Sequence, residues 1–226
     1  MTIKSNLFDA PVRIPAGALE LAGFRRWTNS PSFPEQGRIS FLDGEMEIDM
    51  NAEDISAHSD PKGSVTVALW ILAEKHDIGR VFVDGVRLVN EVANISNEPD
   101  VIVCRWQTLE SADVRLTESV PGGEKYTELV GTPDLVIEFV SDSSVNKDTR
   151  ILRRKYFQAG IAEYWLFDAR GSEIDFQLLT RGAKGFQPNA PDRQGFRLSS
   201  VFPLKFKLTR ERDRIGHWRY TLQHRD

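Results

Sequence analysis

Apolar residues recur along the chain at two spacings, one typical of helices and one typical of strands. Between residues 15 and 27 they recur every three to four positions, which predicts a short N-terminal helix. A longer helical stripe over residues 54–76 is followed by Gly79 and predicts the main helix of the core. A third stripe, over residues 148–159, predicts a helix that ends at Gly160.

Strand-like patterns fill much of the remaining chain. Residues 38–49 and residues 81–89 each alternate around an Asp-Gly pair, which predicts two hairpins. The run 135–140 is nearly all apolar, as expected of a central strand covered on both faces. Further strands are expected at residues 101–103, 114–116, 163–168, 174–179, 196–198 and 202–206. Strands around two main helices predict an α/β fold with a mixed sheet of the α+β kind and additional β-hairpins.

The length of 226 residues allows one sizeable core, and no Pro/Ser-rich linker divides the chain. Hydrophobic residues make up 40% and charged residues 27%, which is ordinary for a globular protein. We therefore expect a single domain over residues 1–226. Arginines crowd the C-terminal end, so residues 207–226 should form a basic tail or strand.

The apolar runs are all far shorter than the roughly 20 residues that a helix needs to cross a bilayer. The N-terminus has no apolar segment of the signal-peptide kind, so we expect a cytoplasmic protein with no membrane partner. Cys104 is the single cysteine, which excludes an internal disulfide and a cysteine-rich zinc site. We interpret Cys104 as a small buried residue of a strand.

The net charge of −4 and the pI near 5.7 argue against a protein that coats nucleic acid. A carboxylate site that binds divalent cations would still reverse the local charge where a phosphate lies, so a nuclease is compatible with this composition. Basic residues cluster at Arg150, Arg153, Arg154 and Lys155 in the third predicted helix. This cluster and the basic C-terminal segment could face a phosphate backbone or form ordinary solvated surfaces.

Carboxylates stand at the ends of predicted strands or inside them, at Glu45, Asp100, Asp134 and Glu138. Glu138 lies within an apolar run, where an ionised carboxylate needs a partner. A shared Mg²⁺ or Mn²⁺ ion is one explanation, because convergent Asp and Glu side chains from neighbouring strands suit it. The other is a salt bridge from Glu138 to an arginine of the next helix, with Asp100 and Asp134 capping strand starts.

Further side chains could take part in such chemistry. Lys147 and Lys155 follow Glu138 in the sequence, and either could orient an attacking water or hold a phosphate. His58 could be a metal ligand or a general base, although hydrogen bonding at a helix start fits it equally well. The tryptophans fit a core or an interface better than base stacking. No P-loop, Rossmann glycine pattern or nucleophile elbow is present in the sequence.

The stretch from residue 131 to residue 168 carries a family resemblance. It contains Gly-Thr-Pro-Asp-Leu-Val-Ile-Glu-Phe-Val-Ser-Asp-Ser-Ser from residue 131, Lys147-Asp148, Tyr156, Gly160 and Glu-Tyr-Trp-Leu-Phe-Asp from residue 163. Upstream lie Asp43-Gly44-Glu45, His58 and Pro99-Asp100-Val101. In this order the blocks resemble the Uma family of restriction endonucleases in the PD-(D/E)xK superfamily, over about residues 15–206.

The resemblance implies a restriction-endonuclease-like core over residues 15–206, in which a helix is followed by a mixed sheet with flanking helices. It assigns Asp100 and Glu138 as the two acidic residues of the motif. It also implies Glu45 as an extra metal ligand. From the residues themselves we expect His58 and Asp134 to support the site.

Two positions depart from the family pattern. Val140 stands where the superfamily has its lysine, and Leu152 stands where many Uma sequences have one. Lys147 or Lys155 would therefore have to supply the cation.

We predict a Mg²⁺- or Mn²⁺-dependent endonuclease that hydrolyses phosphodiester bonds of DNA with metal-activated water. The alternative is a catalytically impaired protein of nuclease fold that acts as a binding or assembly module. The expected partners are nucleic acid, with DNA preferred to RNA, and a second copy of the chain. A homodimer is expected because a two-fold axis presents one site to each strand of a duplex.

Overall fold

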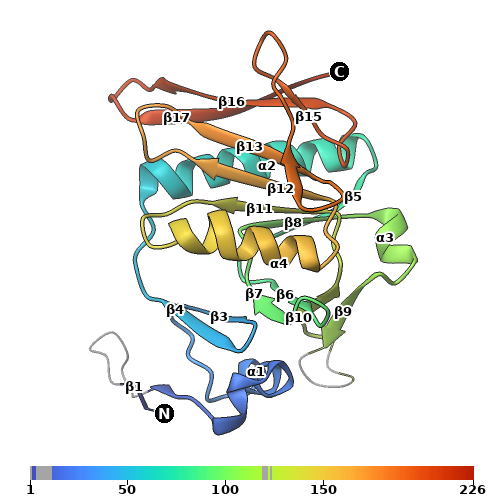
Figure 1. Ribbon diagram of the computed structural model, residues 1–226. Helices are drawn as coiled ribbons and strands as arrows, with labels where there is room; N and C mark the ends of the chain where they lie inside the picture. The colour runs from blue at the N-terminus through green and yellow to red at the C-terminus, as the bar shows by residue number, and fades with distance from the viewer. Residues whose placement is uncertain (1, 4–11, 119–121, 123) are drawn as a thin grey trace. The chain divides into compact units, whose positions relative to one another are not determined.

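The computed structural model describes residues 2–3, 12–118, 122 and 124–226 and has a mixed α+β architecture with two mixed sheets (Figure 1). The predicted fold class is confirmed. By their internal contacts the residues group into two compact units. The first consists of Met1–Ala52, Gly85–Glu98 and Arg115–Gly131, and the second of Glu53–Asp84, Pro99–Val114 and Thr132–Asp226. The single-domain organisation stays a prediction, and residues 1 and 4–11 of the expected N-terminal extension lie outside the described residues.

In its described part, the first unit contains a six-stranded mixed sheet. The strand order is β4 (Glu45–Asp49), β3 (Arg38–Leu42), β7 (Ile95–Asn97), β6 (Arg87–Asn90), β10 (Tyr126–Gly131) and β9 (Val114–Glu118). A separate antiparallel pair is formed by β1 (Thr2–Ile3) and β2 (Val12–Arg13). The 3-10 turn η1 (Ala16–Leu19) leads into α1 (Leu21–Thr28). The predicted helix over residues 15–27 is confirmed in this two-part form.

Aromatic side chains hold α1 against the sheet of the first unit. Phe24 and Trp27 of α1 are buried, and the Phe24 ring lies 5.7 Å from the ring of Phe41 in β3. Arg87 of β6 lies over the Phe24 ring at 5.4 Å and donates a hydrogen bond to the carbonyl of Ile39. The apolar stripe of this helix is therefore explained by its burial.

Of the two predicted hairpins, the first forms and the second does not. β3 and β4 pair antiparallel around Asp43 and Gly44, whose φ angles of 58° and 90° suit a two-residue turn of type I′. By contrast, β5 (Gly79–Val83) and β6 belong to different sheets. β5 pairs with β8 (Val101–Arg105), whereas β6 pairs with β7 and β10. The hairpin over residues 81–89 is wrong because alternation around a turn does not specify which strand each half pairs with.

The second unit is built on another six-stranded mixed sheet within the described residues. Its order is β14 (Phe186–Pro188), β13 (Asp175–Arg181), β12 (Glu163–Asp168), β11 (Leu135–Phe139), β8 and β5. β11 runs parallel to β12 and antiparallel to β8. Every residue of β11 is buried, which confirms the predicted central strand. Cys104 in β8 is also buried, as predicted, and burial raises the pKa of its thiol to about 12.

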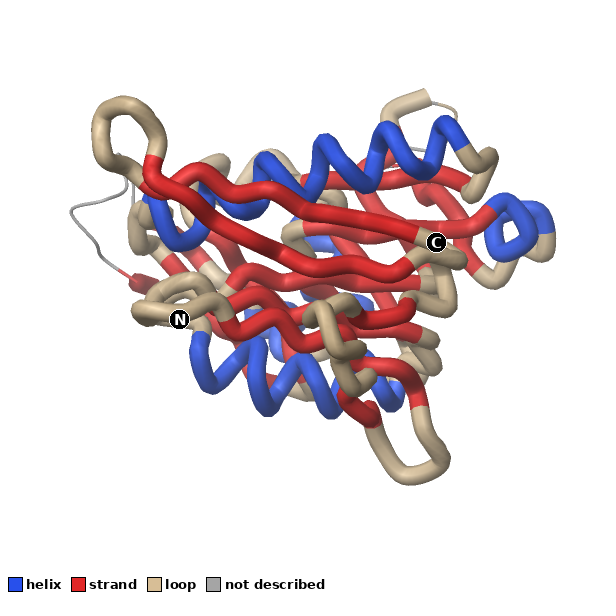
Figure 2. The backbone as a smooth tube through the Cα atoms, turned by 90° about the horizontal axis from the view of Figure 1, so that it is seen from above, coloured by secondary structure: helices blue, strands red, loops and turns tan. Residues whose placement is uncertain are grey.

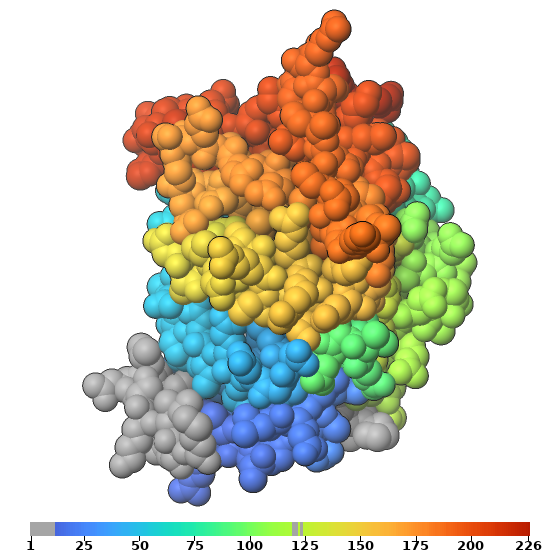
Figure 3. Space-filling model, viewed as in Figure 1, coloured from blue at the N-terminus to red at the C-terminus, as the bar shows by residue number. Residues whose placement is uncertain are grey.

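Helices cover the two faces of this second sheet from opposite sides (Figure 2). On one side, α2 (Asp60–Lys75) continues the π-helical turn η2 (Ile55–Ser59), and together they match the predicted helix over residues 54–76. On the other side, η3 (Lys147–Leu152) leads into α4 (Arg153–Gln158). Figure 3 shows α4 at the molecular surface on this side.

Alternation along β11 divides its side chains between the two helical layers. Ile137 and Phe139 belong to the same apolar cluster as Val65 and Leu69 of α2. Glu138, between them in sequence, points to the other side and meets Tyr156 of α4. The single carboxylate of the apolar run is thereby placed under α4.

The C-terminal segment forms a three-stranded antiparallel sheet of β15 (Arg197–Leu198), β16 (Lys205–Arg212) and β17 (Trp218–Arg225). Residues 207–226, expected as a basic tail or strand, therefore consist mostly of strands. The short helix α3 (Trp106–Glu110) follows β8. Across the part of the chain that is described, the helices are all too short or too polar to span a bilayer.

Candidate active site

Asp100 and Glu138 are brought together by the register of β8 and β11. These strands pair antiparallel with Ile137 opposite Val101, so one further step places Asp100 opposite Glu138. The backbone N–H of Asp100 donates to Glu138 Oε2 at 3.3 Å, and the N–H of Phe139 donates to Asp100 Oδ2 at 2.8 Å. Both carboxylates are buried. The adjoining ends of these two neighbouring strands thus hold two adjacent, buried acidic side chains.

The N-terminal end of the α2 layer supplies basic groups to Asp100. Asp54 accepts a hydrogen bond from the backbone N–H of Ala57 at 2.5 Å, so it caps η2 and fixes where the helix begins. One turn apart, His58 and Lys62 then face the same way. His58 Nε2 lies 3.6 Å from Asp100 Oδ2, and Lys62 Nζ lies 3.5 Å from Asp100 Oδ1.

The opposite helical layer holds Glu138 and its neighbours. The hydroxyl of Tyr156 in α4 donates to Glu138 Oε1. In η3, Asp148 is buried and accepts a hydrogen bond from the Ser144 hydroxyl. The ring of Tyr156 packs edge-on against Tyr164, at 5.3 Å between centroids, and the Tyr164 hydroxyl donates to the backbone carbonyl of Asp148. The Glu138 carboxylate is therefore oriented by a packed, hydrogen-bonded set of side chains.

Burial and neighbouring charges act differently on the two carboxylates. Burial alone would raise the pKa of Asp100, but His58 and Lys62 outweigh it and hold that pKa below its usual value. Burial, followed by the negative charges of Asp100 and Asp148, raises the pKa of Glu138 well above its usual value. An added cation at this point would allow both carboxylates to ionise together.

The predicted site residues are only partly brought together. Asp134 lies at the start of β11, where its carboxylate accepts from Arg105 Nε at 2.6 Å and from the Arg105 N–H at 2.8 Å. Glu45 begins β4 in the first unit and is exposed. The roles proposed for Glu45 as a ligand and Asp134 as support stay predictions. Among the described residues, the alternative of an arginine bridge from the next helix to Glu138 is not found, and Asp134 instead pairs with Arg105 of β8.

Two predicted lysines and His58 are placed as follows. Lys147, in η3, is half-buried and its positive charge acts on Glu138. Lys155 is buried in α4, next to Tyr156 in sequence. His58 joins Asp100 to Glu53, since its Nδ1 lies 3.3 Å from Glu53 Oε2. His58 therefore links the aspartate of the pair to a second carboxylate.

The side chains of this site show whether a divalent cation could be bound here. In the part of the chain that the structure describes, no three His, Cys, Asp or Glu side chains are grouped as a metal site. Asp100 and Glu138 nevertheless fit an ion such as Mg²⁺, which binds through one or two carboxylates together with water and phosphate. The burial of these two carboxylates beside each other is the observation that a cation would explain.

Sequence reasoning missed Lys62 and Glu53 as members of this cluster and did not name Tyr156 as a partner of Glu138. Lys62 follows His58 by four residues, so helical spacing was an available signal. Nothing in the local sequence indicated that the start of α2 would lie beside Asp100. That contact joins residues 38 positions apart.

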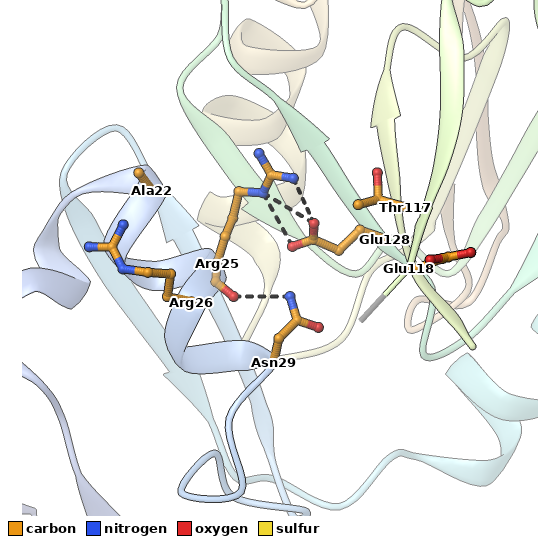
Figure 4. A pocket seen from close by; sticks show the side chains of 7 residues that line it. All are labelled: Ala22, Arg25, Arg26, Asn29, Thr117, Glu118 and Glu128. Carbon is orange, nitrogen blue, oxygen red and sulfur yellow. Dashed lines mark hydrogen bonds and ion pairs between the residues drawn. The ribbon is translucent and has the colours of Figure 1, made fainter. Parts of the chain in front are cut away.

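A separate pocket of about 470 Å³ lies within the first unit (Figure 4). It is lined by Ala22, Arg25, Arg26, Asn29, Thr117, Glu118 and Glu128. Arg25 donates to both oxygens of the buried Glu128 carboxylate, at 2.8 Å for the shortest bond. Since the lining contains two arginines and two glutamates, the charges of this pocket largely cancel, and it offers no concentrated anion site.

Comparison with known proteins identifies the family of the chain. A family profile described as "Putative restriction endonuclease" matches residues 21–211. The chain belongs to the Uma2 family. The resemblance read from the sequence is therefore confirmed, and the nuclease class of hydrolases is the activity that this family suggests.

A solved structure supports the Uma2 fold. The crystal structure of a "putative nuclease" from Anabaena variabilis ATCC 29413 superimposes with a TM-score of 0.52 at 16% sequence identity. The match covers 81% of this chain and 90% of the other. At this identity the likeness establishes the fold alone. No curated protein matches the chain at a significant level.

Proposed function

We propose that this Uma2 protein is a Mg²⁺- or Mn²⁺-dependent endonuclease that hydrolyses phosphodiester bonds of DNA. The proposal is carried by the two buried carboxylates that face each other across β8 and β11, Asp100 and Glu138. They would hold the ion, and Glu45 is proposed as a third ligand from the family resemblance. A cytoplasmic location is proposed from the sequence.

The protein groups around the pair have distinct tasks in this proposal. Hydrogen bonds from the Phe139 N–H and the Tyr156 hydroxyl fix the orientation of the two carboxylates. His58, between Glu53 and Asp100, keeps the aspartate ionised. When bound, the metal would polarise the phosphodiester and lower the pKa of a water. In the hydrolysis, the water oxygen bonds to phosphorus and gives up one proton to solvent, one P–O ester bond breaks, and the leaving oxygen takes up one proton from solvent.

Calorimetric titration with Mn²⁺, paired with a cleavage assay on duplex and single-stranded DNA, tests this proposal. We expect Glu138→Gln and Asp100→Asn to abolish Mn²⁺ binding and to slow cleavage by roughly 100-fold or more. Glu163→Gln is the matched control, because Glu163 is a fully buried glutamate of the neighbouring strand β12. Wild-type protein that folds, binds no Mn²⁺ and cuts no DNA would contradict the proposal, and cleavage of RNA alone would change its substrate.

A binding module of nuclease fold is the second candidate. It is favoured by Val140 and Leu152, which stand where the superfamily and many Uma sequences have a lysine. Both side chains are apolar and fully buried. It is also favoured by the lack of a three-ligand group among the described side chains. The same Mn²⁺ titration separates the candidates, because the module needs no metal site.

We propose a homodimer formed by the outer face of α2. Val67, Trp70 and Ile71 are exposed there to 59%, 48% and 60%. Gly63 lies on the same face, and a Cβ added to it would meet nothing within 4 Å, so the fold of the chain does not require glycine. Glycine inside a helix costs about 1 kcal/mol relative to alanine. Antiparallel pairing about Val67 would set Ile71 of one copy over Gly63 of the other. The absence of a side chain at Gly63 would then allow the two helices to approach closely.

Light scattering after size exclusion tests the dimer. Wild type is expected at twice the chain mass and Ile71→Glu at the chain mass. Gly63→Ala should raise the melting temperature of the Ile71→Glu monomer but weaken association of the wild-type chain. A monomeric wild type, or a dimer that Ile71→Glu leaves intact, would exclude this interface.

A further inference from the structure

The ammonium group of Lys62 is buried in the carboxylate cluster. Lys62 is only 8% exposed, and its Nζ lies 2.9 Å from Glu53 Oε1 and 3.0 Å from Asp84 Oδ2. The third carboxylate is that of Asp100, at 3.5 Å. Lysine is rarely buried without paired charge, because removing its ammonium from water is costly. Here three carboxylates surround one ammonium, which exceeds what neutralisation requires.

The three carboxylates around Lys62 differ in their access to solvent. The side chain of Asp100 is 6% exposed, that of Glu53 is 31% exposed, and that of Asp84 is 53% exposed. Contacts with an exposed carboxylate are weak, because water screens them. The bond from Lys62 to Asp84 is therefore the one that an incoming anion can replace most easily. An ammonium has three donors, so it can keep Glu53 and Asp100 while it binds a phosphate oxygen.

Other lysines near the site are placed differently. The charge of Lys147 acts on Glu138 from η3, and Lys155 is buried in α4. Lys62 approaches from α2 and acts on Asp100. The apolar Val140 and Leu152 supply no positive charge at their own positions.

We propose that Lys62 is the catalytic ammonium of this site and contacts the scissile phosphate through Nζ. This inference rests on the proposed nuclease function. As the P–O bond breaks, negative charge increases on the phosphoryl oxygens, and a fixed ammonium in a buried site stabilises that charge more than water does. Asp84 holds the ammonium until phosphate replaces it.

Single-turnover cleavage of duplex DNA at saturating Mn²⁺, measured together with Mn²⁺ affinity and melting temperature, tests the role of Lys62. Lys62→Met should slow cleavage by about 100-fold or more. Its Mn²⁺ affinity should be unchanged or higher, because a cation beside Asp100 has been removed. Lys62→Arg should restore part of the rate. Lys75→Met, an exposed lysine at the other end of α2, is the control and should cleave like wild type.

Asp84→Asn gives a second, independent readout. It removes the exposed competitor of the phosphate, so KM for DNA should fall several-fold while the melting temperature changes little. This variant also decides the case in which Lys62→Met fails to fold.

The outcomes separate this inference from the function on which it rests. A wild type that cuts no nucleic acid defeats the proposed function. An active wild type with Lys62→Met within about threefold of it overturns the role of Lys62 alone. A larger loss for Lys147→Met or Lys155→Met than for Lys62→Met also overturns it, as does a raised KM for Asp84→Asn.

Discussion

The two ends of β11 each hold a buried carboxylate, and the two carboxylates have different partners. At the start of the strand, Asp134 is paired with Arg105 through a side-chain and a backbone hydrogen bond, so its charge is compensated. At the other end, Glu138 lies beside a second carboxylate, Asp100, and within the described residues it accepts hydrogen bonds only from neutral groups, the Asp100 N–H and the Tyr156 hydroxyl. Asp134 is compensated by its arginine, and Asp100 by Lys62 and His58. By contrast, Glu138 has no hydrogen bond from a charged group in the part of the chain that is described, and it leaves room for a cation from outside the chain.

The largest expected effect is a difference in cleavage rate between variants at the two ends of β11. Glu138→Gln should reduce cleavage by roughly 100-fold or more, because one of two proposed ligands is lost. Asp134→Asn should leave the rate within about threefold of wild type while lowering the free energy of unfolding by about 1–2 kcal/mol, since Arg105 loses its charged partner. The two variants are compared by cleavage rate and by urea unfolding. Equal losses of rate would mean that the two ends of β11 do not differ in role.

A smaller effect is expected from the hydroxyl that orients Glu138. Tyr156→Phe keeps the ring and its packing against Tyr164 but removes the hydrogen bond. Outer groups that orient metal ligands typically change metal affinity by about 10-fold to 100-fold, so we expect Mn²⁺ affinity to fall by about 10-fold. Calorimetry measures the change, and an affinity equal to that of wild type would show that this hydroxyl orients nothing.

The sequence predicted one member of the site better than the others. Glu138 was found because a carboxylate inside an apolar strand is conspicuous by itself. Its pairing with Asp100 follows from strand register, which alternation alone does not supply. Lys62 was missed for the same reason, since its contact with Asp100 depends on where α2 begins relative to β8. The wrong hairpin over residues 81–89 shows that local turn signals carry no information on long-range pairing.

The smallest expected effect concerns Glu163, a buried carboxylate outside the site. Burial raises its pKa, although hydrogen bonds from Ser199 and the Val201 N–H oppose the shift. A carboxyl whose folded pKa is raised contributes stability that is fully present below its unfolded pKa, about 4.3, and is lost as pH rises through the folded pKa. The unfolding free energy of wild type relative to Glu163→Gln should therefore fall between pH 4 and pH 8. A difference that stays constant or grows would contradict the sign of this shift.

The central claim is that Asp100 and Glu138 share a divalent cation, and the anomalous signal of Mn²⁺ in crystals grown with the metal tests it directly. The account predicts one ion at about 2.1–2.3 Å from an oxygen of each carboxylate, lost in Glu138→Gln crystals under the same conditions. A fully formed crystal with no ion there, or with Mn²⁺ bound by other residues while DNA is still cleaved, would contradict it.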